Sequence, residues 1–185
     1  MPPKSKFSQE EITEAALGIV RTEGVQALTA RALGDRLGSS TRPIFTVYRN
    51  MEEVLETVVK AAKALYKEYV ERGLAETSAF KGVGTQYILF AVNEPKLFQL
   101  LFMAEQKQQP HIEGVLSLID ESYGRILSSI EEEYHLSRAS ADRIYRHMWI
   151  YTHGIAVLCA TKMCSFTGEE ISEMMTEVFK SLISC

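Results

Sequence analysis

The sequence predicts an all-α protein of about nine helices. Apolar residues recur three and four positions apart along most of the chain, which is the spacing of a helix with one buried face. Few stretches show the alternation that a half-buried strand requires. Of the 185 residues, 46% are hydrophobic, which is enough to form a sizeable core in a globular protein.

The first helix is expected over residues 8–23. Ser8 is a suitable N-cap and Glu11 lies three residues later, which is the pattern of a capping box. Gly24 is expected to end this helix in a left-handed conformation. The apolar side chains of the helix share one face: Ile12, Ala15, Ala16, Ile19 and Val20.

Two short helices are expected next. The second helix begins after the Thr29 cap and ends at Gly38, and a polar turn over residues 39–41 follows. Pro43 suits the first turn of a third helix. Two short helices joined by such a turn predict a helix-turn-helix, whose second helix enters the major groove of DNA.

A long fourth helix is expected over residues 51–74. Asn50 can cap it, and Glu52 and Glu53 suit its positive N-terminus. This helix would join the N-terminal region to the rest of the chain without a flexible linker. The later helices are expected at residues 78–92, 95–105, 111–134, 137–164 and 168–184.

Charge is distributed unevenly along the chain. The net charge is −4, yet residues 1–51 carry seven Lys and Arg against five Asp and Glu, a net charge of +2, which leaves −6 for the remainder. A basic N-terminal region suits contact with phosphate, while the acidic remainder disfavours it.

The predicted motif assigns DNA contacts to particular side chains. Arg42 can bind guanine through two hydrogen bonds, and Thr and Pro carbons can contact a thymine methyl. Arg31 and Arg49 suit phosphate contacts, and Lys4 and Lys6 form a basic N-terminal arm. The full set expected at DNA is Lys4, Lys6, Thr29, Arg31, Ser40, Thr41, Arg42, Pro43, Phe45, Thr46 and Arg49.

Residues 8–55 resemble the DNA-binding domain of the TetR family. The resemblance rests on Leu28-Thr29-Ala30-Arg31-Ala32-Leu33-Gly34-Asp35-Arg36-Leu37-Gly38, on Ile44-Phe45 with Tyr48, and on Glu52-Glu53-Val54-Leu55. It implies a dimeric repressor with about nine helices and a ligand pocket in the C-terminal domain. Phe45 stands where the family usually has a phosphate-binding Tyr, and Met51 where it usually has a Lys, so these two phosphate contacts are not implied.

The C-terminal half carries a second resemblance. Trp149, followed by His153-Gly154, and the stretch 90–98 are similar to TetR C-terminal domains that are marked by a Trp-His-Gly pattern. Together the two resemblances imply a helix-turn-helix domain over residues 1–51 and an effector-binding and dimerisation domain over residues 52–185.

Aromatic and Met side chains gather in the C-terminal half, where a small, largely apolar effector is expected to bind. Tyr hydroxyls, the Trp N–H and His153 would orient it, although His153 also suits a core or interface position. The residues expected at the effector are Tyr66, Tyr69, Tyr87, Phe90, Phe98, Phe102, Met103, Tyr123, Trp149 and His153. An alternative is a C-terminal domain that only dimerises or binds a protein partner.

An enzyme is not expected, and neither is a cofactor or a bound metal. The sequence shows no nucleophile–base constellation, glycine-rich phosphate loop or metal-ligand cluster. A small helical enzyme assembled from distant residues is the remote alternative. No apolar run approaches the ~18 residues of a membrane span, and the N-terminus lacks a signal sequence, so a cytoplasmic protein without a membrane partner is expected.

The expected partners are a second copy of the chain, a palindromic double-stranded DNA operator and the effector. The last two predicted helices carry apolar residues on more than one face, so one face can pack on the core and another on a second copy. A two-fold dimer presents two recognition helices, which suits a palindrome. Release from DNA on binding the effector would make the protein a repressor.

Overall fold

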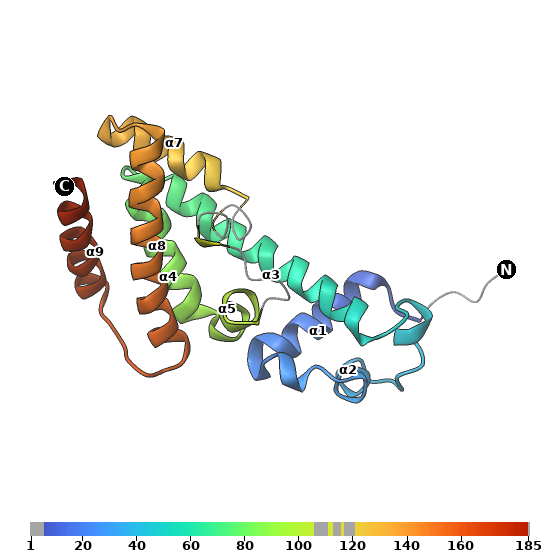
Figure 1. Ribbon diagram of the computed structural model, residues 1–185. Coiled ribbons are helices and arrows are strands. Elements are labelled where there is room, and N and C mark those ends of the chain that lie inside the picture. The colour runs from blue at the N-terminus through green and yellow to red at the C-terminus, as the bar shows by residue number, and fades with distance from the viewer. Residues whose placement is uncertain (1–5, 106–110, 113–115, 117–120, 185) are drawn as a thin grey trace. The chain divides into compact units, whose positions relative to one another are not determined.

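The computed structural model describes residues 6–105, 111–112, 116 and 121–184 (Figure 1). These residues form eight α-helices and two short 3-10 turns, and no strand occurs among them. The prediction of an all-α fold is therefore confirmed. The bounds of the α-helices are α1 Gln9–Glu23, α2 Ala30–Arg36, α3 Met51–Leu74, α4 Ala79–Asn93, α5 Pro95–Phe102, α7 Tyr123–Tyr134, α8 Arg138–Ala160 and α9 Gly168–Ile183.

Side-chain caps determine where several helices begin. Ser8 accepts a hydrogen bond from the Glu11 amide and the Glu11 carboxylate accepts one from the Ser8 amide, which completes the predicted capping box of α1. Thr167 and Glu170 form the same box at α9. Gly24 ends α1 with a φ of +93°, but its ψ of 168° is extended and not left-handed helical.

The predicted third helix is reduced to one 3-10 turn, Ile44–Thr46. Its hydrogen bonds run mainly from residue i+3 to residue i, as in Ile44 N to Thr41 O (3.1 Å) and Val47 N to Ile44 O (3.1 Å). The segment is too short to propagate a longer helix, because Asn50 accepts a hydrogen bond from the Glu53 amide (2.9 Å) and so begins α3 only a few residues later. The expectation of a third α-helix was therefore wrong in extent.

The chain divides into two compact units. The first comprises Met1–Tyr66 and Glu94–Ala104, and the second comprises Lys67–Asn93 and Glu105–Cys185. Helix α3 contributes its first part to one unit and its last two turns to the other. The first unit thus extends beyond residue 51, which was predicted from the sequence as the end of the DNA-binding domain.

The first unit has a core of apolar side chains from α1, α2, α3 and α5. Helices α1 and α5 pack together, and they are also joined by an ion pair between Arg21 and Glu94, the residue immediately before α5. Nε of Arg21 donates to Oε2 of Glu94 at 2.6 Å, and Nη2 donates to Oε1. The fully buried side chains of this core include Ile12, Ala16, Val20, Leu33, Ile44, Val54, Val58, Leu97 and Phe98.

The second unit is organised around α4 and α8, which pack against each other, while α7 and α9 both contact this pair (Figure 1). The last turn of α3 approaches α4 backbone to backbone. A Cβ on Gly73 would lie 2.6 Å from the Cα of Val83, and a Cβ on Gly82 would collide with the Gly73 carbonyl oxygen. The crossing therefore requires glycine at both positions.

No helix within the described residues combines the length and apolarity needed to cross a membrane.

Candidate nucleic-acid interface and effector site

The segment Thr41–Tyr48, here called the recognition turn, is anchored from one side. Ile44 is fully buried and Tyr48 is 5% exposed, and the Tyr48 hydroxyl shares a hydrogen bond of 2.9 Å with the Thr13 hydroxyl of α1. Arg42, Phe45 and Thr46 are exposed. The turn thus presents a defined outer surface that the protein's own core does not use.

The polar segment between α2 and the recognition turn passes close to α2 because of a glycine. A Cβ on Gly34 would lie 3.0 Å from the Ser39 carbonyl oxygen and 3.3 Å from the Ser40 carbonyl carbon. Gly38 then reverses the chain with a φ of +60°. Gly38 was predicted to end the second helix, whereas the packing role of Gly34 was not predicted from the sequence.

The predicted DNA-contacting cations are exposed where the structure describes them. Arg31 and Arg42 lie at the surface, and Lys6 Nζ donates to the Ser39 hydroxyl at 3.1 Å. This contact places the end of the basic arm beside the polar turn that follows α2. Lys4 lies outside the described residues.

Arg49 is engaged by an acidic neighbour. Its Nε lies 2.5 Å from Glu53 Oε1, and its backbone amide donates to Glu53 Oε2 at 2.7 Å. The hydrogen bond from the Arg49 amide, reinforced by the guanidinium, lowers the pKa of Glu53. A phosphate that binds Arg49 would have to compete with this carboxylate. Glu53 was not among the residues predicted at DNA.

Three other predicted DNA contacts have a local role. The Thr29 hydroxyl oxygen caps α2 by accepting from the Ala32 amide at 3.1 Å. The Thr46 hydroxyl donates to the Pro43 carbonyl at 2.6 Å. Pro43 opens the 3-10 turn, while Ser40 is exposed. The Thr29 and Thr46 oxygens therefore stabilise the motif itself.

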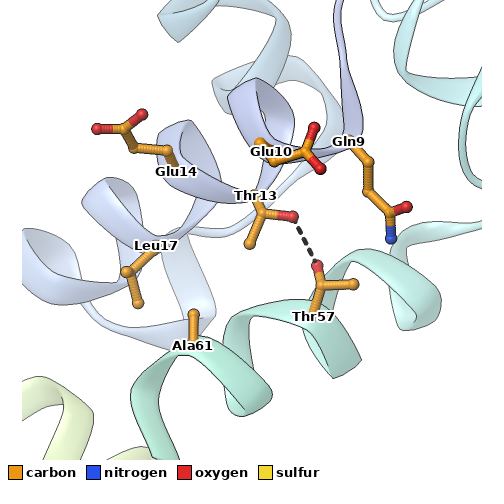
Figure 2. A pocket seen from close by; sticks show the side chains of 7 residues that line it. All are labelled: Gln9, Glu10, Thr13, Glu14, Leu17, Thr57 and Ala61. Atoms are coloured by element: carbon orange, nitrogen blue, oxygen red, sulfur yellow. Dashed lines mark hydrogen bonds between the residues drawn. The ribbon is translucent and has the colours of Figure 1, made fainter. Parts of the chain in front are cut away.

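A pocket of about 550 Å³ opens in the first unit between α1 and α3 (Figure 2). Thr13 and Thr57 are joined across it by a hydrogen bond of 3.2 Å, and Glu10 and Glu14 lie at its side. Its lining contains none of the residues predicted to bind an effector. The lining residues are Gln9, Glu10, Thr13, Glu14, Leu17, Thr57 and Ala61.

The predicted effector residues fall in both units. Tyr66, Phe98, Phe102 and Met103 belong to the first unit. There the Phe102 ring centroid lies 5.0 Å from that of Tyr66 and 5.1 Å from that of Phe98, so these three side chains form one aromatic cluster. Such packing is what an ordinary core also requires.

In the second unit, Tyr87, Trp149 and His153 form a polar aromatic cluster, here called the histidine cluster. The Tyr87 hydroxyl and His153 Nδ1 are 2.9 Å apart, and the Trp149 indole stacks on the imidazole with a centroid distance of 5.0 Å and an interplanar angle of 17°. Burial lowers the pKa of His153 below its ordinary value, so the neutral imidazole is favoured at neutral pH.

The other predicted effector residues of the second unit, Tyr69, Phe90 and Tyr123, make further ring contacts. Tyr69 packs edge to face on Phe90, with ring centroids 5.2 Å apart. Tyr123 donates its hydroxyl hydrogen to Asp142 and stacks on Tyr145. Burial, together with the Asp142 carboxylate, raises the pKa of Tyr123. These contacts tie α7 to α8.

The comparison with protein families agrees with the C-terminal resemblance. A family described as "Tetracyclin repressor-like, C-terminal domain" matches residues 80–182, which is more than half of the chain. The matched range contains α5, α7, α8, all but one residue of α4 and of α9, and the whole histidine cluster. No curated protein gives a significant match. The all-α fold and the family match together show that this chain belongs to the TetR family of transcriptional regulators.

Proposed function

We propose that this regulator binds a palindromic DNA operator as a homodimer and represses transcription until a small, largely apolar effector releases it. The observation that carries the DNA-binding part is the recognition turn. Buried Ile44 and Tyr48 fix its backbone, while Arg42, Phe45 and Thr46 face outward without serving the core. An anchored turn that exposes an arginine supports readout of base edges in a major groove.

The surface of α8 supports a second copy of the chain as partner. Ile150 is 52% exposed, and a Cβ on Gly154, one turn later, would meet no atom within 4 Å. An exposed mid-helix glycine costs about 1 kcal/mol relative to alanine, which suggests that a close neighbour in an assembly requires it. A dimer that packs through α8 and α9 would bring two recognition turns to one duplex.

The histidine cluster supports the effector part of the proposal. Tyr87, Trp149 and His153 combine apolar ring surface with polar atoms that can orient a ligand. Helix α3 has residues in both units and contains no glycine or proline before Gly73. A ligand that shifts the end of α3 could therefore change how the recognition turn is presented, provided that it binds the two arrangements with different affinity.

Selection of duplexes from a random-sequence library tests the DNA-binding part. A two-fold symmetric consensus is expected, and Arg42→Ala should lose ~1–3 kcal/mol of discrimination at one base pair in each half-site. Lys81→Ala, which removes an exposed cation of α4, is the matched control and should leave the preference unchanged. If no duplex is enriched, or if both variants behave alike, DNA recognition through this turn is excluded.

A ligand screen tests the effector part. Trp149 is the single tryptophan, so its fluorescence should change when a ligand contacts the histidine cluster. A hit should also weaken operator binding, and His153→Ala should lose both responses, whereas His135→Asn, at the exposed end of α7, should keep them. Ligands that bind without changing operator affinity would favour a C-terminal domain that only dimerises or binds a protein partner.

A further inference from the structure

Phe45 is an exposed aromatic residue, and the recognition turn is anchored by residues other than Phe45. Its side chain is 45% exposed, while its neighbour Ile44 is fully buried and Tyr48, one turn later, holds α1 through its hydroxyl. The backbone of the recognition turn is thus fixed by residues other than Phe45. The phenyl group has no hydrogen-bond donor or acceptor, so the surface that it offers beside Arg42 is apolar.

The surroundings of Phe45 favour a nucleic acid over an apolar protein surface. Arg42 and Arg49 lie three residues before it and four after it, and both are exposed. The Arg49 side chain is 90% exposed even though it pairs with Glu53. Arg42 and Arg49 are complementary to the negative phosphates that flank a groove of the duplex. The phenyl ring between them is complementary to the few apolar groups that the base edges present in that groove.

We propose that Phe45 reads the C5-methyl group of a thymine in each half-site by van der Waals contact; this rests on the proposed DNA-binding function. A phenyl ring has no donor or acceptor, and the thymine methyl is the apolar group that the major groove displays among base-edge donors and acceptors. The Thr46 hydroxyl is already bonded to the Pro43 carbonyl, so the middle of the turn offers little polar readout.

The spacing along the turn locates this thymine. Arg42 and Phe45 are three residues apart. The bonds from Ile44 N to Thr41 O and from Thr46 N to Pro43 O make this stretch a run of 3-10-type turns, which rises about 2 Å per residue, or about 6 Å in all. That distance corresponds to roughly two base-pair steps of duplex. The thymine read by Phe45 therefore lies about two base pairs from the guanine read by Arg42.

Replacement of thymine by deoxyuridine tests the contact, because it removes only the methyl group. In the duplex enriched by selection, each thymine is replaced by deoxyuridine in both half-sites at once. Replacing the thymine that Phe45 contacts should lower the affinity of the wild-type protein about fourfold per half-site, which is the loss expected when one buried methyl group is removed. Replacing the other thymines should have no such effect through Phe45. Phe45→Ala should bind the thymine and deoxyuridine duplexes equally, whereas Phe45→Leu should keep part of the preference.

Phe45→Tyr is the matched control, since it keeps the ring and adds a hydroxyl. It should keep the preference for thymine over deoxyuridine. All three variants should melt within a few degrees of the wild type, because the ring is exposed and its neighbours carry the anchoring. A thymine preference that persists in Phe45→Ala overturns this inference alone. A library that yields no enriched duplex overturns the proposed function, and this inference with it.

Discussion

Loss of the Arg21 side chain should destabilise the first unit far more than loss of an ordinary surface arginine. Arg21 is 53% exposed, but the Glu94 carboxylate that it binds is only 5% exposed. Arg21→Ala leaves that carboxylate buried without its cation. Breaking a fully buried ion pair costs about 3–5 kcal/mol, and water reaching the exposed half of Arg21 reduces the expected loss to about 2–4 kcal/mol. For a chain of this length the melting temperature should fall by roughly 4–16 °C.

Urea unfolding followed by circular dichroism measures this loss, at one fixed protein concentration because dimerisation shifts apparent stability. Arg138→Ala is the matched control. Arg138 is 51% exposed and pairs with Glu131, which is 28% exposed, so this surface pair should contribute at most about 1 kcal/mol. The double variant Arg21→Met with Glu94→Leu should recover most of the stability lost in Arg21→Ala. Equal losses in the two arginine variants would refute the reasoning.

Three further outcomes are expected. Glu53→Gln releases Arg49 for phosphate and should tighten DNA binding about two- to fivefold per half-site and steepen its salt dependence, as measured by fluorescence anisotropy. Gly82→Ala should cost about 3 kcal/mol or more in urea unfolding because its Cβ would collide with the Gly73 carbonyl oxygen. The added Cβ of Gly84→Ala clashes only with the terminal methyl of the flexible Met175 side chain and should cost little. Burial lowers the pKa of His153 in the folded state, so the unfolded state takes up the proton first as the pH falls. The free energy of unfolding should therefore be at its full value above about pH 6.5 and should decrease below it. His153→Gln should reduce this dependence on pH.

Features that depend on neighbouring residues were predictable from the sequence. The capping box of Ser8 and Glu11, the Thr29 cap and the full span of α3 follow from side chains within a few positions of one another. The recognition turn departs from this rule. Pro43 and apolar spacing favour a helix there, but Asn50 begins α3 too soon for one to extend.

Features that depend on distant residues were not predictable. Arg21 and Glu94 lie 73 positions apart, and nothing in either neighbourhood marks them as partners. The same holds for the contact between Tyr87 and His153, which were both predicted at the effector but not as a pair. The pocket beside Thr13 and Thr57 is formed by side chains of separate helices that follow ordinary amphipathic patterns, so no sequence motif predicts it.

The division of the chain limits how it can be recombined with a relative. Because the first unit takes in Glu94–Ala104 as well as Met1–Tyr66, a hybrid that keeps its contacts needs junctions after Tyr66, after Asn93 and after Ala104. A single crossover after residue 51 would pair α1 with a foreign α5 and Arg21 with a foreign residue in place of Glu94. The proposed DNA-binding and effector-binding parts are thus not exchangeable as two consecutive segments, because α5 has to be transferred with the N-terminal helices.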